Sequence, residues 1–328
     1  MDYKISARQS KMWSRIGARA SFGQAILDLA NNNDNMMAIS ADLGRSSGFG
    51  PLISKHPNKF VNVGIAEQNM VGVAAGFAKL GFTTYATSFA PFLAFRSSEI
   101  TRMNLSYMET PVNLVGLASG LALNFLGNSH FGLEDITVFR SFPNVSIFSP
   151  CDCAEIFKII ELTSKLNKPT YIRLNGGVNY PVVYEEDYKL EYGKINIINE
   201  FGNDVHIYAT GSMVYHCKIA SEILKKEGIN CSVFNVHTIH PFDDEFLKNK
   251  LNQNPKLMIT AEEHFISGGL GSLILEKLND FSSNKNVLRI GLPNEYLESG
   301  EYEYLLEKYN LNSISIVKTI KAEFYDKS

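Results

Sequence analysis

Glu67 stands where a carboxyl group could serve as a general acid or base. It follows a short strand candidate, Phe60–Val63, and a turn at Gly64. The next run, Met70–Lys79, has almost no polar face, which predicts a helix buried on all sides. A carboxyl group at the start of such a helix lies in low dielectric, as functional carboxyl groups often do. The alternative is a structural cap, because a helix dipole favours negative charge at its N-terminus.

Three phenylalanines, Phe89, Phe92 and Phe95, recur at every third position. If the segment is helical, they form one aromatic stripe, and the simplest interpretation of such a stripe is core packing. The same stripe could stack on the face of a flat heterocycle, because aromatic rings pair well in offset stacks. The spacing alone leaves both interpretations open.

Asp42 lies two residues after the end of the strand candidate Met36–Ser40. Ligands of open α/β sheets bind at the carboxyl ends of strands, so this carboxylate is a candidate binding residue. It could equally be an ordinary turn residue, since aspartate is frequent at such positions.

The elements that must position these residues alternate between β-rich and helical patterns. This alternation predicts an α/β fold with two parallel-sheet domains and helices on both faces of each sheet. We expect a first domain at residues 1–192, which includes a turn-rich linker, and a second domain at residues 193–328. In the first domain, strands are expected at Met36–Ser40, Phe60–Val63, Thr83–Thr87, Val112–Gly116, Val145–Phe148 and Thr170–Arg173. Its helices are expected at Ala18–Asn31, Gln68–Leu80, Phe92–Met108 and Ala154–Leu166.

The second domain repeats the alternation on a smaller scale. Its strands are expected at Val205–Ala209, Cys231–Val236, Leu257–Thr260 and Val287–Ile290. Its helices are expected at Val214–Lys226, Asp243–Asn252, Leu270–Leu278, Tyr302–Tyr309 and Asn312–Phe324.

The composition excludes several classes of function. Of 328 residues, 45% are hydrophobic and 20% are charged, as in ordinary globular proteins. The net charge of −3, without a basic block, gives no electrostatic footprint for nucleic acid. No apolar run approaches the ~20 residues that span a bilayer, and the N-terminus does not resemble a secretory signal. The chain has four cysteines, and the two nearest, Cys151 and Cys153, are spaced for neither a zinc site nor a redox Cys-x-x-Cys pair. We therefore expect reduced thiols in a cytoplasmic protein without a metal site.

Four segments together resemble the transketolase family of thiamine-diphosphate enzymes. They are VGIAEQN at 63–69, TSFAPFLAFR at 87–96, FRSFPNVSIFSPCD at 139–152 and EEHFISGGLG at 262–271. The similarity extends from about Gly17 to about Glu323. It implies a pyrimidine-binding domain followed by a transketolase C-terminal domain.

The resemblance implies a role for each candidate residue in cofactor binding. Glu67 would hydrogen-bond the aminopyrimidine ring of thiamine diphosphate and promote the tautomer that deprotonates the thiazolium carbon. Phe89, Phe92 and Phe95 would line the pyrimidine pocket, with Phe92 as the first choice for direct stacking. Asp42 would face the cofactor near its ring junction.

It also implies four residues that act on the substrate. His130 would hydrogen-bond substrate oxygens and assist proton movement, a task that suits imidazole. Ser46, Arg19 and Arg173 would bind a sugar phosphate, for which the guanidinium fork is well shaped. Taken singly, each arginine is more often a surface ion-pair partner.

Two positions depart from the family pattern. Leu126 stands where an aspartate usually recognises a substrate hydroxyl, and Ala118 stands where a histidine is common. A site built to bind a hydroxyl discriminates strongly through that contact. Its loss puts the ordinary pentose and hexose phosphates in doubt as substrates.

The sequence also lacks the family's Gly-Asp-Gly segment, which binds Mg²⁺ and the cofactor diphosphate. We therefore expect the C-terminal subunit of a split transketolase that transfers a two-carbon ketol unit between sugar substrates. An N-terminal partner subunit would hold Mg²⁺, and the assembly would be an α2β2 heterotetramer. Alternatives are the β subunit of a 2-oxo-acid dehydrogenase, a deoxyxylulose-phosphate-synthase-like enzyme, or a non-catalytic partner subunit.

Overall fold

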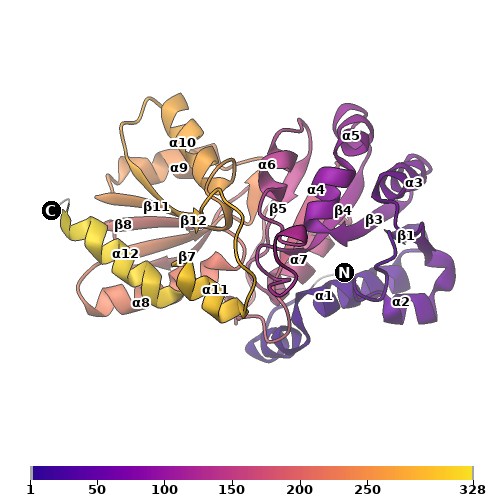
Figure 1. The fold of residues 1–328 in the computed structure, drawn as a ribbon, viewed down its shortest axis with the longest axis horizontal. Coiled ribbons are helices and arrows are strands. Elements are labelled where there is room, and N and C mark those ends of the chain that lie inside the picture. Colours follow the sequence, from indigo (N-terminus) through magenta and orange to yellow (C-terminus); the bar gives the residue numbers. More distant parts are fainter. Residues whose placement is uncertain (1–2, 327–328) are drawn as a thin grey trace.

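Two β-sheets, each covered by helices, lie side by side in the computed structural model, which describes residues 3–326 (Figure 1). The first is a seven-stranded sheet in the order β10-β5-β6-β4-β3-β1-β2. Its strands are β1 (Met36–Ser40), β2 (Phe60–Asn62), β3 (Thr83–Phe89), β4 (Val112–Ser119), β5 (Ser146–Phe148), β6 (Thr170–Asn175) and β10 (Thr238–His240). All pairs are parallel except that of β10 with β5.

The helices of this part cover both faces of the first sheet (Figure 1). Helix α1 and helix α7 pack on one face, and α3, α4 and α6 pack on the other. Their bounds are α1 (Ala7–Asn32), α2 (Gly50–Lys55), α3 (Glu67–Lys79), α4 (Ala90–Arg96), α5 (Ser98–Thr101), α6 (Asp135–Arg140) and α7 (Cys153–Thr163). Short helices η1 (Pro57–Lys59), η2 (Arg102–Tyr107) and η3 (Gly127–Ser129) lie in the connections.

The second sheet has five strands in the order β12-β11-β8-β9-β7, of which only β7 is antiparallel to its neighbour within the described residues. The strands are β7 (Asn196–Glu200), β8 (Val205–Ala209), β9 (Cys231–Asn235), β11 (Leu257–Phe265) and β12 (Val287–Leu292). The helices are α8 (Met213–Lys226), α9 (Asp244–Asn252), α10 (Leu270–Asp280), α11 (Tyr302–Lys308) and α12 (Ser313–Asp326). In Figure 1, α9 and α10 lie on one side of this sheet and α8, α11 and α12 on the other.

One apolar cluster runs through both parts of the chain. It joins buried residues of α3 and α4 to residues of α9 and α10, such as Met70, Leu93, Leu247 and Leu273. Because burial of apolar surface is the main favourable term in folding, this shared core fixes the two sheets against each other.

The α/β fold class is confirmed, with two mostly parallel sheets. The sequence did not predict the antiparallel edge strands β7 and β10, and β10 crosses from the second half of the chain into the first sheet. The boundary between residues 192 and 193 stays a prediction. No helix in the described part of the chain is long and apolar enough to cross a bilayer. All four cysteines are buried and free.

Two helices differ from expectation near the candidate residues. Helix α1 begins at Ala7 and is kinked at Gly17, whose φ of 81° favours glycine. The single helix expected at Phe92–Met108 is divided into α4, α5 and η2. Phe89 is therefore the last residue of β3 and not part of a helical stripe.

Candidate active site

Glu67 is the first residue of α3, and its side chain is only 4% exposed. Ser88 Oγ donates to Glu67 Oε1 over 3.3 Å, and Arg96 Nη1 donates to the same oxygen over 3.0 Å. Ser88 belongs to β3 and Arg96 ends α4, so three consecutive elements hold this carboxylate. The structure therefore buries the Glu67 carboxylate, as the sequence predicted.

A cluster of aromatic rings lies beside this carboxylate. The rings of Phe89 and Phe92 are 5.6 Å apart, and the His130 ring lies 5.7 Å from Phe89 and 5.3 Å from Phe92. The Arg96 guanidinium carbon stacks 3.7 Å above the centre of the Phe92 ring. We call the position between Glu67 and Phe92, which the Arg96 guanidinium fills, the ring seat. Phe95, in contrast, is 58% exposed.

His130 lies in the connection between β4 and α6. Its Nδ1 is 2.9 Å from Ser129 Oγ. The second domain holds this connection, because Asn128 Nδ2 donates to Leu297 O over 2.6 Å and Leu297 N donates back to Asn128 Oδ1 over 2.9 Å. The two sheets therefore jointly position the imidazole.

Asp42 and Ser46 line one pocket of about 300 Å³ beyond the carboxyl end of β1. Asn62 Nδ2 donates to Asp42 Oδ1 over 3.3 Å, and Asp42 N donates to Asn62 Oδ1 over 3.0 Å. This reciprocal pair fixes Asp42 in a left-handed conformation with a φ of 59°.

Arg19 lines an adjoining pocket of about 270 Å³ together with Arg45 and Ser46. Gly17 and Gly177 also line this pocket, and a Cβ at Gly17 would lie 2.3 Å from Gly177 O, so this close approach requires glycine. Two guanidinium groups and a hydroxyl form a donor set that suits a phosphate or another dianion.

Arg173 requires a correction. It was expected at the end of the strand Thr170–Arg173 as a phosphate-binding residue, but it lies inside β6 and is fully buried. Its Nε donates to Asp135 Oδ2 over 2.9 Å, its Nη1 to Asn175 Oδ1 over 3.1 Å, and its Nη2 to Glu263 O over 2.7 Å. With Nε, Nη1 and Nη2 donating to protein acceptors in both halves of the chain, the buried Arg173 guanidinium is not available to a sugar phosphate in this structure.

The two departures from the family pattern differ in their exposure to solvent. Ala118 is 3% exposed near the end of β4, and Leu126 is 54% exposed beside η3. Phe125 next to it is 65% exposed. The His130 connection therefore presents the apolar side chain of Leu126 where the family pattern has a polar one.

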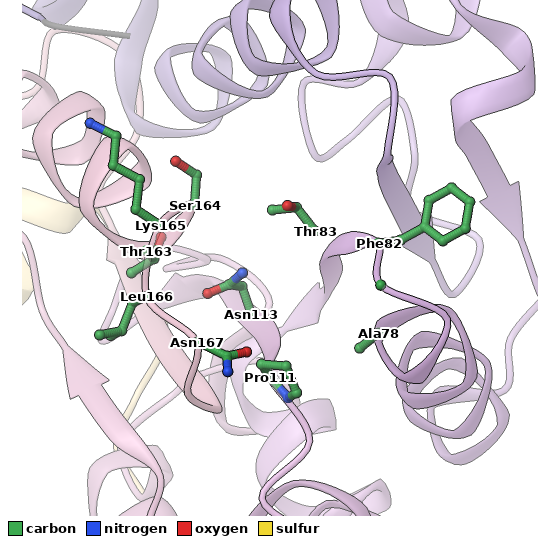
Figure 2. Close-up of a pocket in the computed structure, with 11 residues that line it drawn as sticks. Ala78, Phe82, Thr83, Pro111, Asn113, Thr163, Ser164, Lys165, Leu166 and Asn167 are labelled. Atoms are coloured by element: carbon green, nitrogen blue, oxygen red, sulfur yellow. The ribbon is translucent and has the colours of Figure 1, made fainter.

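A further pocket, of about 160 Å³, is lined by a different set of residues (Figure 2). Phe82, Thr83 and Pro111, which line it, precede or begin β3 and β4. It is therefore at the amino ends of the strands, whereas Asp42, Ser88 and Phe89 are at the carboxyl ends. Ligands of open α/β sheets bind at the carboxyl ends, so this pocket is not the candidate site.

Sequence reasoning missed three polar residues of the site, Asn62, Arg45 and Arg96. The position of Arg96 beside Phe92 could have been predicted, since the two residues lie four apart on a helix and such positions share a face. Arg45 lies in the loop after β1 and meets Asn62 at the end of β2 in one pocket, and the sequence carries no periodic signal for this meeting.

Two consecutive segments of the chain each match a protein-family model. Residues 14–178 match "Transketolase, pyrimidine binding domain", and residues 193–316 match "Transketolase, C-terminal domain". The chain therefore belongs to the transketolase family, which confirms the resemblance found in the sequence.

Three similar proteins match this chain over nearly their whole length. A "Putative transketolase C-terminal section" from Methanocaldococcus jannaschii is 34% identical, covering 94% of this chain and 96% of that protein. An apulose-4-phosphate transketolase subunit from Phocaeicola vulgatus is also 34% identical, covering 93% of this chain and 96% of that protein. The solved structure "Split gene transketolase, inactive beta4 tetramer" superposes with a TM-score of 0.84 at 32% identity, covering 95% of this chain and 99% of that one.

Proposed function

We propose that this chain supplies the pyrimidine-binding half of the active site in a ketol-transferring enzyme. The chain is the C-terminal subunit of a two-chain transketolase-like enzyme, and such an enzyme depends on thiamine diphosphate. The observation that carries the proposal is the buried Glu67 carboxylate beside the Phe92 and His130 rings.

The ring seat fits the aminopyrimidine of thiamine diphosphate. It already holds a flat group that stacks on Phe92 and donates a hydrogen bond to Glu67. Glu67 and Phe92 would hold the ring, with Phe89 as a wall and Asp42 near the ring junction; Phe95 would contribute from the rim. When bound, the cofactor supplies the electron sink that ketol transfer requires. Glu67 acts on the ring as its acid–base partner.

The substrate would lie between His130 and the pocket of Arg19, Arg45 and Ser46. The two arginines and the hydroxyl suit a terminal phosphate, and His130 would donate to or accept from substrate oxygens at the reacting end. Exposed Leu126 offers no polar contact for the hydroxyl that the family pattern reads. We therefore expect an unusual sugar phosphate rather than the common pentose phosphates.

Assembly would complete the site. Gly72 and Gly76 lie on an exposed face of α3, and nothing is within 4 Å of a Cβ added to either. The predicted burial of α3 on all sides is thus not reached within one chain. We propose that two copies meet through this face and that two N-terminal subunits, which hold Mg²⁺ and the diphosphate, complete an α2β2 heterotetramer.

The decisive experiment is co-expression with an adjacent gene that encodes a Gly-Asp-Gly diphosphate-binding chain. Calorimetry with thiamine diphosphate and Mg²⁺ should show weak or no binding to this chain alone and clear binding to the pair. Tight Mg²⁺-dependent binding by the chain alone would contradict the split arrangement.

A panel of ketose donors and aldose acceptors then tests the substrate. Ribose 5-phosphate and xylulose 5-phosphate should react poorly with the assembled pair. Turnover of these two sugars at an efficiency typical of transketolases would show that Leu126 and Ala118 do not change specificity.

A further inference from the structure

Arg96 contacts the two residues that would hold the cofactor ring. Its Nη1 donates to Glu67 Oε1 over 3.0 Å, and its guanidinium lies 3.7 Å above the Phe92 ring. Phe92 and Arg96 are four residues apart on α4, so the arginine folds back along one face of its own helix. A flat donor stacked on Phe92 and bonded to Glu67 has the shape and polarity of an aminopyrimidine.

The two members of this ion pair have different access to water. The Glu67 side chain is 4% exposed, whereas the Arg96 side chain is 48% exposed. A buried carboxylate without a partner is costly, so Glu67 needs a cationic or donor group beside it at all times. An arginine that is half exposed loses little when it moves into water, because exposed ion pairs and cation–π contacts are weak.

We propose that Arg96 is a displaceable occupant of the ring seat. In the cofactor-free chain it neutralises Glu67, and it leaves the seat when the aminopyrimidine ring of thiamine diphosphate enters. This inference rests on the proposed function, because it assumes that Glu67 and Phe92 receive that ring. Arg96 therefore gates cofactor entry, and it forms no covalent bond.

Displacement makes removal of Arg96 act in opposite directions on two quantities. Without Arg96, Glu67 in the cofactor-free chain keeps the hydrogen bond from Ser88 but loses its cationic partner, and the chain becomes less stable. The cofactor no longer has a competitor, so it binds more tightly. A purely structural arginine would lower stability and weaken binding together.

Arg96→Ala tests this in the assembled two-chain enzyme and in the chain alone. Calorimetry with thiamine diphosphate and Mg²⁺ should give about fivefold tighter binding to the assembled variant, because one half-exposed ion pair and one cation–π contact no longer compete with the cofactor. The isolated variant chain should melt about 2 °C lower. Arg96→Lys keeps the charge without the flat stack, so its cofactor affinity should lie between those of Arg96→Ala and the wild type.

Arg102→Ala is the matched control. It removes an equal charge nearby, from an exposed 3.5 Å pair with Glu99, and should change neither quantity. Unchanged or weaker cofactor binding by assembled Arg96→Ala overturns the proposal. If no assembled form, wild type included, binds the cofactor, the proposed function itself fails. Equal binding by wild type and Arg96→Ala rejects only the role of Arg96.

Discussion

Two arginine–carboxylate pairs in this protein have nearly equal lengths and opposite surroundings. Arg173 and Asp135 are 2.9 Å apart, and both side chains are fully buried. Arg96 and Glu67 are 3.0 Å apart, but the arginine is half exposed. Burial fixes the first pair as part of the fold, because opening it would strand a charge in low dielectric. Partial exposure leaves the second pair free to open.

The partners of each arginine agree with this division. Arg173 also donates to the main-chain oxygens of Gly132 and Glu263, so it joins the connection that carries His130 to the second sheet. Arg96 stacks on Phe92 at the candidate site. The distance within an ion pair therefore says little about its role, whereas burial and the remaining partners say much.

Arg173→Met should have the largest effect, because it leaves Asp135 buried without its counter-charge. We expect a loss of about 3–5 kcal/mol in the free energy of unfolding, measured by urea denaturation. Arg102→Ala serves as the exposed control, with a change below about 1 kcal/mol. If Arg173→Met unfolds like the wild type, the pair is not the fixed contact described here.

Glu67→Gln should keep the fold and remove most of the turnover. An amide occupies the same volume and can still bond to Ser88, but it cannot exchange a proton with the cofactor ring. We expect the rate of the assembled enzyme to fall about 10²- to 10⁴-fold, measured with saturating cofactor. A variant that turns over within a few-fold of the wild type would reduce Glu67 to a helix cap.

Gly72→Leu with Gly76→Leu tests whether assembly encloses α3, the helix that Glu67 begins. The added side chains meet open space in the single chain, so the chain should still fold. They would block a close approach of a second copy, so light scattering should report a smaller particle and activity should be lost with it. An active assembly of unchanged mass would place the interface elsewhere.

Glu155 extends the comparison to a carboxyl group that is fully buried without an arginine partner among the described residues. It accepts hydrogen bonds from Asn235, Tyr188 and the Cys151 amide. Burial, and then the charge of Asp152, raises the pKa of Glu155 to about 7 from an ordinary 4.5. The stability gained from the protonated form is complete below pH 4.5 and is lost as the pH rises to about 7. The free energy of unfolding should therefore fall over this range, by at most about 1.4 kcal/mol per pH unit for this group.

Urea denaturation at pH 5, 6, 7 and 8 measures this slope. In Glu155→Gln the group no longer titrates, so the decline between pH 5 and 7 should be shallower than in the wild type. Identical slopes would show that Glu155 ionises alike in the folded and unfolded chain.

Periodicity carried most of the fold prediction. The strands β1, β4 and β8 are buried and mostly apolar runs between turn signals, and such runs can be recognised in a single sequence. The three-residue strand β10 could not be predicted from local sequence, because it forms only by pairing with β5, which is far away in the sequence. Tertiary context decided it, as it often decides short strands.

The site was predicted in its residue types and less well in its side-chain directions. Glu67, Phe92 and His130 come together as expected, although their assigned roles remain proposals. Arg173 was expected at the end of its strand, but β6 continues to Asn175 and the Arg173 guanidinium bonds to the buried Asp135. A boundary error of that size is ordinary for strand ends, and here it changed the interpretation of the residue.

The crossing of β10 into the first sheet also bears on how the chain is made. During synthesis, the first sheet emerges from the ribosome with β5 as an open edge, and the strand that covers it arrives only after the linker and β9 have been translated. Open strand edges invite pairing with other chains. The nascent protein therefore cannot complete its first sheet until the chain has been made as far as His240 of 328 residues, well into its second half.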